Sequence, residues 1–145
     1  MKFLVFAIAA LTFISLLGCG QDTADLPRQN PKSVDASATP LEIVNRRMAA
    51  YNRHDLQAFL DLYDDGIEIF GYPDRALGKG TEHIRSIFEP LFQEGVVQVE
   101  IHQQITKDSY VVNHETVNYG DSTTEYVSIY EVRGGLIQSV RFVRD

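Results

Sequence analysis

The chain of 145 residues contains one cysteine, Cys19, and no tryptophan. One cysteine cannot close a disulfide within the chain, and without a second cysteine or a paired histidine it offers no zinc site. The four histidines form no HxH, HxxxH or HExxH pattern, and "GKG" at residues 78–80 lacks the rest of a phosphate-binding loop. The sequence therefore predicts neither a metal site nor a cofactor.

Basic residues are also scarce. Thirteen lysines and arginines stand against 20 acidic residues, which gives a formal net charge of -7. An acidic surface repels nucleic-acid backbones and anionic lipid headgroups, so we expect no nucleic-acid partner. The length suits one domain with a single hydrophobic core.

The long uncharged run of the chain lies at residues 3–17, directly after Lys2. A basic start followed by such a run is typical of a secretory signal, and fifteen residues are short for a membrane span, which needs about 20. Residues 16–19, "LLGC", resemble the lipobox of bacterial lipoproteins, in which the cysteine is lipidated and becomes the new N-terminus. This resemblance implies a signal peptide at residues 1–18 and lipidation of Cys19. The alternative is an ordinary cleaved signal with an incidental cysteine.

Lipid chains on Cys19 would anchor the exported protein to the cell envelope. Gly20 follows, not aspartate, so the resemblance implies the periplasmic side of the outer membrane if the host is Gram-negative. Residues 21–39 contain two prolines and no aromatic residue. Such a segment buries too little apolar surface to fold, so residues 19–39 are predicted to be a lipid-attached, disordered tether before a domain at residues 40–145.

The domain is predicted to begin with a helix, because Thr39, Pro40 and Glu42 form a capping box with proline in the first turn. Asp55 is the predicted cap of a second, short helix. Each helix is supported by a stripe of apolar residues at helical spacing. The stripes are Leu41, Val44, Met48 and Tyr51, then Leu56, Phe59, Leu60 and Tyr63.

A short strand is predicted at residues 67–70, followed by a turn-rich segment at 71–80. A third helix is expected to start with Thr81 as its cap. Pro90 lies within its apolar stripe, which predicts a kink or an early end near Glu89.

After Gly95 the apolar period changes to two, which predicts a strand with Ile101 and Ile105 on its dry face and His102 on its wet face. Three further strands are predicted at residues 109–119, 125–132 and 136–144, with a glycine turn between the last two. Helices followed by strands predict an α+β fold with one antiparallel sheet and its helices on one face.

Three segments, "YNRHDLQAFLDLYDDGIEIF", "GKGTEHIRSIFEPLF" and "YEVRGGLIQSVRF", resemble the NTF2-like superfamily, in particular its SnoaL-like and ketosteroid-isomerase-like branch. The resemblance covers residues 40–144. It implies a cone in which a curved antiparallel sheet wraps around three N-terminal helices and leaves an apolar pocket at its wide end. It also implies a homodimer packed sheet to sheet.

The same resemblance argues against steroid isomerisation. In the ketosteroid isomerases an aspartate base, a tyrosine and a protonated aspartate carry the reaction. The matching positions in this chain are Gly71, Arg47 and Ser128, so none of the three groups is retained. A shift of one or two residues brings in only Tyr72 or Asp74.

Other catalytic candidates are His114, Glu115 and Asp74. Adjacent strand residues point to opposite faces, so one of His114 and Glu115 should face the pocket and could act as a general base. The alternative for His114 and Glu115 is a structural role in hydrogen bonds across the sheet. For the aromatic residues among the ligand-binding candidates named below, the alternative is a role in the hydrophobic core. His54 and His83 are expected at the surface or in helix capping. The predicted ligand-binding residues are Tyr63, Tyr72, Tyr126, Ser128, Tyr130, Val140 and Phe142.

Three functions follow as hypotheses. In the first, the domain binds a small apolar molecule or a protein partner without catalysis. In the second, it is an isomerase, cyclase or hydrolase that uses pocket Glu, His or Asp with tyrosines. In the third, an adhesive lipoprotein, the cone is filled by its own side chains. A hollow cone would exclude the third.

Overall fold

The computed structural model describes Lys32 and residues 34–144. The predicted signal peptide, Cys19 and most of the predicted tether lie outside the described residues. Within the described part of the chain, no helix has the length and apolar character needed to cross a membrane.

Two helices begin where their caps predict. In α1 (Pro40–Asn52) the Thr39 hydroxyl accepts from the Glu42 amide at 3.3 Å, and the Glu42 carboxylate accepts from the Thr39 amide at 2.7 Å. In α2 (Leu56–Leu60) the Asp55 carboxylate accepts from the Ala58 amide at 3.0 Å. Both caps satisfy amides that would otherwise lack a partner at a helix start, which confirms the two predictions.

The third helix, α3 (Thr81–Glu94), differs from its prediction at both ends. Gly80 is the N-cap and no side chain caps the helix, so Thr81 lies inside it. The helix continues past Pro90 and ends at Glu94, with Gly95 as a C-cap whose φ of 70° is left-handed. Phe92 lies beyond the proline and is buried, so packing of the apolar face outweighs the hydrogen bond that the proline removes.

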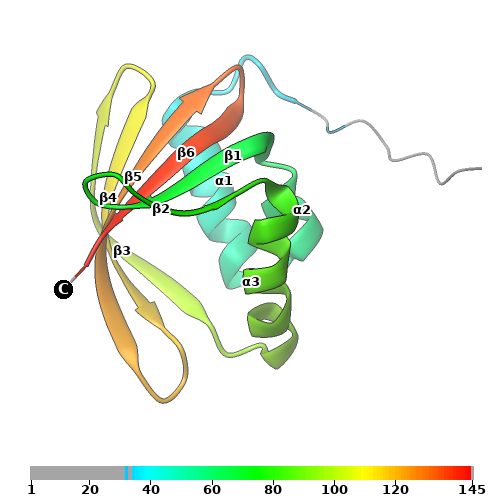
Figure 1. Cartoon of the computed structure of the whole chain (residues 1–145), viewed down its shortest axis with the longest axis vertical. Helices are drawn as coiled ribbons and strands as arrows, with labels where there is room; N and C mark the ends of the chain where they lie inside the picture. The colour runs from blue at the N-terminus through cyan, green and yellow to red at the C-terminus, as the bar shows by residue number, and fades with distance from the viewer. Residues whose placement is uncertain (1–31, 33, 145) are drawn as a thin grey trace, which may run out of the picture. The chain divides into compact units, whose positions relative to one another are not determined.

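Six strands form one curved sheet with the helices on one side (Figure 1), in the order β2-β1-β6-β5-β4-β3. The predicted α+β class is confirmed. Three details differ: β1 begins at Tyr63, which was expected in the second helix, residues 75–79, expected in a turn, form β2, and β1 pairs with β6 in parallel, so the sheet is mixed. The strands are β1 (Tyr63–Gly71), β2 (Arg75–Lys79), β3 (Gln98–Lys107), β4 (Tyr110–Asn118), β5 (Thr123–Arg133) and β6 (Leu136–Val143).

A bulge in β3 reverses the predicted faces of its second half. Ile101 pairs with Glu115 and Gln103 with His114, so His102 is the extra residue. Every side chain after a one-residue bulge changes face. Ile105, expected on the dry face, is therefore 65% exposed.

The core lies between the helices and the concave face of the sheet, and an aromatic cluster forms much of it. The Phe59 ring lies 4.9 Å from Phe88, 5.2 Å from Tyr63, 5.3 Å from Phe92 and 6.0 Å from Tyr51, measured between centroids. The tilted and edge-to-face arrangements are those that aromatic pairs favour. This cluster joins all three helices to the start of β1.

The chain contacts the domain before α1 begins. The Lys32 ammonium donates to the Tyr63 carbonyl at 2.8 Å and pairs with Asp65. A Cβ on Gly135, whose φ is +77°, would lie 2.6 Å from the Asp35 carbonyl oxygen. The C-terminal part of the expected tether is therefore packed against the domain.

Candidate functional site

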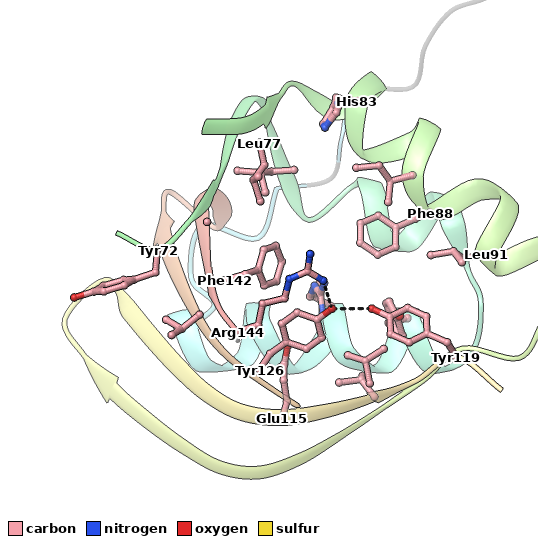
Figure 2. Close-up of a pocket in the computed structure, with 18 of the residues that line it drawn as sticks. Tyr72, Leu77, His83, Phe88, Leu91, Glu115, Tyr119, Tyr126, Phe142 and Arg144 are labelled. Atoms are coloured by element: carbon pink, nitrogen blue, oxygen red, sulfur yellow. Dashed lines mark hydrogen bonds between the residues drawn. The ribbon is translucent and has the colours of Figure 1, made fainter. Parts of the chain in front are cut away.

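A pocket of about 590 Å³ opens on the concave side of the sheet, beside α3. Its size is that of small-molecule sites, which are roughly 300–1,000 Å³ and mostly apolar. Figure 2 shows Phe88 and Leu91 of α3 on one side, facing Tyr126 and Phe142 from the sheet and Tyr119, which follows β4. The other apolar lining residues include Leu77, Ile87, Val99 and Val117.

Glu115 of β4 lies at the floor of this pocket and is 2% exposed. Its carboxylate accepts hydrogen bonds from the Ser128 hydroxyl at 2.7 Å, the Asn113 amide at 3.0 Å and the Tyr130 hydroxyl at 3.4 Å. A buried carboxylate is tolerated only when donors replace its water. These three donors hold the group in place.

Arg47 of α1 is the cation of the pocket floor, and it is 4% exposed. Its Nε donates to the Tyr63 hydroxyl at 2.9 Å. The guanidinium also lies 5.0 Å from the centroid of the Phe59 ring and 5.4 Å from those of Tyr51 and Tyr130. Such cation–π contacts partly replace the water that a buried cation loses.

The charge of Arg47 is maintained by its surroundings. Burial by itself would lower the pKa of this guanidinium, but its charge interactions with Tyr130, Tyr63 and Glu115 raise the pKa above its usual value. Arg47 therefore stays protonated.

The tyrosines around Arg47 stay protonated as well. Burial raises the pKa of Tyr51 to about 12 and raises the pKa of both Tyr63 and Tyr130. Their hydroxyls are therefore hydrogen-bond donors at neutral pH. Tyr51 lines the pocket, whereas the other two lie behind its floor.

Arg75 and Arg144 line the pocket and are exposed to solvent, which places them at its mouth. Figure 2 shows Arg144 beside the Tyr126 hydroxyl, to which its Nη1 donates at 3.5 Å; that hydroxyl lies 3.1 Å from the hydroxyl of Tyr119. Arg75 lies against Gly71, where an added Cβ would be 3.3 Å from the arginine Nε. A glycine at residue 71 leaves room for this guanidinium.

His83 also lines the pocket, although surface or capping positions were expected for it. Its ring lies over Gly78, where an added Cβ would be 2.0 Å from two ring atoms. His54 is not part of the pocket lining; its Nε2 lies 2.7 Å from the Val97 carbonyl oxygen, within hydrogen-bond distance.

Of the predicted catalytic residues, only Glu115 faces the pocket. His114 points to the outer face of the sheet, where it pairs with Glu125 and its ring lies 5.0 Å from that of His102. Asp74 has an 81% exposed side chain and lies 3.8 Å from Arg141, outside the pocket lining.

The predicted ligand-binding residues divide into two groups. Tyr126 and Phe142 line the pocket, and so does Tyr72, which is 61% exposed at its edge and turned away from the centre (Figure 2). The others are buried outside the pocket lining. These are Tyr63, Ser128, Tyr130 and Val140.

Sequence reasoning did not select the pocket arginines, but the pattern contained a signal for two of them. Arg47 lies three residues after Val44 and four before Tyr51, on the inward stripe of α1. Arg144 follows Phe142 by two residues, which places it on the same side of the last strand. Arg75 carries no such signal, because the sequence of its strand predicts a turn.

Two of the three positions that match the isomerase residues, Gly71 and Arg47, do line the pocket. The third, Ser128, is buried and bonds to Glu115. Across Lys32 and residues 34–144, no three His, Cys, Asp or Glu side chains are grouped so that they could hold a metal ion.

Solved structures share this fold. An uncharacterized cystatin fold protein from Novosphingobium aromaticivorans has a TM-score of 0.67 at 24% identity, over 74% of this chain and 99% of its own. An NTF2-like protein of unknown function from Cytophaga hutchinsonii has a TM-score of 0.65 at 18% identity, over 74% and 90%. An LEH-like epoxide hydrolase from M. tuberculosis has a TM-score of 0.60 at 17% identity, over 73% and 82%.

At these identities the structures establish the NTF2-like fold and no shared activity. No curated protein matches the chain. The family assignment comes from the sequence, because the SnoaL-like domain matches residues 44–140, about two-thirds of the chain. The chain belongs to the SnoaL-like domain family.

Proposed function

We propose that this domain binds a small, largely apolar molecule in the pocket. The observation that carries the proposal is the open volume of about 590 Å³ beside a well-packed aromatic core. Side chains that could have filled the space, such as Phe88 and Tyr126, form its walls instead. This openness disfavours the third hypothesis, an adhesive domain with a filled cone.

A neutral fluorescent probe, N-phenyl-1-naphthylamine, tests the pocket directly. Wild-type protein is expected to bind it saturably, with a rise in emission. Val117 of β4 is 7% exposed and faces the pocket, so Val117→Trp places an indole in the cavity. This variant should weaken probe binding by roughly tenfold or more, a loss of about 1.4 kcal/mol.

Val112 of the same strand faces the other side of the sheet, so Val112→Trp is the matched control. It should bind the probe within about twofold of wild type. Circular dichroism checks that both variants are folded. Absence of saturable binding by wild type, or equal binding by the two variants, contradicts the proposal.

Enzymatic activity is a second candidate, favoured by the position of Glu115 in the pocket lining. An epoxide hydrolase shares the fold, which makes hydrolysis one reaction class to assay. The three donors on the carboxylate argue for a structural role, because they occupy three of its roughly four acceptor positions and leave one for a general base to use. Turnover that disappears in Glu115→Gln while ligand binding persists would support catalysis.

We also propose that the protein is exported and anchored to the envelope through Cys19. The support is the sequence of residues 2–19, with its basic start, uncharged run and "LLGC" ending. Cells fed radiolabelled palmitate should label the wild-type protein and not Cys19→Ser. Persistent labelling of the variant would refute the anchor.

A homodimer formed through the outer face of the sheet completes the proposal. Apolar side chains gather there around a shallow groove lined by Ile105, Val112 and Val127 with Gln103 and His114. Sedimentation velocity measures the outcome: Val112→Trp should favour the monomer, while Val117→Trp should not change the association. A wild-type monomer at all accessible concentrations would exclude this interface.

A further inference from the structure

The pocket arginines differ from the other cations of this acidic chain. The described residues include eleven lysines and arginines, and seven of them lie within 4.0 Å of a carboxylate of another described residue. Four have no such partner in this part of the chain: Arg47, Arg53, Arg75 and Arg144. Three of these four, all except Arg53, line the pocket. Positive charge without a described carboxylate partner is therefore concentrated at one site.

Sheet topology brings two of these arginines to the same edge of the pocket. Gly71 of β1 pairs with Arg75 of β2 on one side and with Phe142 of β6 on the other. Arg144 follows Phe142 by two residues. The two guanidinium groups therefore approach the mouth from the strands on either side of β1. Figure 2 shows Arg144 beside Phe142 and Tyr126.

The carboxylate of Glu115 does not neutralise this mouth. It lies at the floor, where it is bonded to Ser128, Asn113 and Tyr130, and where Arg47 is the cation that interacts with it. The excess positive charge consequently lies at the mouth. The walls between mouth and floor are mostly apolar, with Leu91 and other aliphatic and aromatic side chains.

We infer that the molecule bound in this pocket is an anionic amphiphile. Its single acidic group, a carboxylate or another oxyanion, lies between Arg75 and Arg144 at the mouth, and its apolar body fills the cavity toward Glu115. Guanidinium groups suit oxyanions because their fork of donors matches two oxygens. The inference rests on the proposed function and adds the chemical class of the ligand.

Two probes with the same apolar body, one neutral and one anionic, test this inference. 8-Anilino-1-naphthalenesulfonate is N-phenyl-1-naphthylamine with an added sulfonate, so its apolar body is the same. Wild-type protein should bind the anionic probe more tightly than the neutral one in low-salt buffer at neutral pH. In Arg75→Gln/Arg144→Gln the anionic probe should bind roughly five- to tenfold more weakly, as expected for two partly solvated ion pairs. Neutral-probe binding should weaken by a smaller factor, so that the preference for the anionic probe is lost.

Arg53→Gln is the matched control, because Arg53 is an exposed arginine outside the pocket lining and without a described carboxylate partner. It should bind both probes as wild type does. Salt should weaken only the anionic probe.

The outcomes separate the inference from the proposed function. If both probes bind wild type equally, the pocket exists and the ligand class is wrong. If the preference for the anion survives in the double variant, the sulfonate is bound elsewhere and the inference is also wrong. If neither probe binds saturably, the proposed function fails together with the inference.

Discussion

Replacement of Arg47 by alanine is expected to lower the free energy of unfolding by about 3–5 kcal/mol, the range for breaking a buried charge network. The change removes a guanidinium that contacts three aromatic rings and leaves the buried Tyr63 hydroxyl without this donor. It also removes the cation that interacts with Glu115 and leaves a cavity in its place. Urea denaturation followed by circular dichroism measures the loss.

Arg53→Ala is the control for this experiment. Arg53 lies at the C-terminal end of α1, the same helix, but its side chain is exposed. Its replacement should change stability by no more than about 0.5 kcal/mol. An Arg47→Ala variant as stable as this control would show that the guanidinium is not held by the contacts described.

Phe59→Ala is expected to cost about 3–5 kcal/mol, the usual range for a buried phenylalanine. Phe59 is fully buried, and its ring contacts four other aromatic rings from α1, α3 and β1. Because those elements are held apart by the remaining contacts, the cavity cannot collapse completely. Thermal and urea unfolding should both show the loss.

The comparison variant is Phe70→Ala. Phe70 is only partly buried in β1, with the guanidinium of Arg141 over its ring at 4.7 Å. The smaller buried area predicts a loss of about 1 kcal/mol. If the two variants are equally stable, the aromatic cluster is not the centre of the core.

The local elements of this domain could be predicted because their signals are local. The capping box at Thr39 and the cap at Asp55 satisfy helix amides within three residues of themselves. Alternation placed the last three strands correctly for the same reason, since neighbouring residues of a strand face opposite sides wherever it pairs.

Errors occurred where a distant contact decides the local structure. The sequence of β2 predicts a turn because it is short, exposed and without a clear apolar face; pairing with β1 makes it a strand. The bulge at His102 is defined by the pairing of β3 with β4, which the sequence of β3 alone does not reveal. α3 continues through Pro90 because Phe92 is buried against Tyr51 and Phe59, which no local propensity records.

By itself the sequence determined the α+β class, the order of the helices and the last four strands, and the restriction that one of His114 and Glu115 faces inward. Only the tertiary structure decided that Glu115 is that residue. It also decided that three arginines distant in sequence meet at one pocket. The physical reason is that helix-capping hydrogen bonds and the spacing of apolar residues involve residues that are close together in the chain. The direction in which a sheet curves, and hence which face encloses a cavity, is set by packing between elements far apart in the chain.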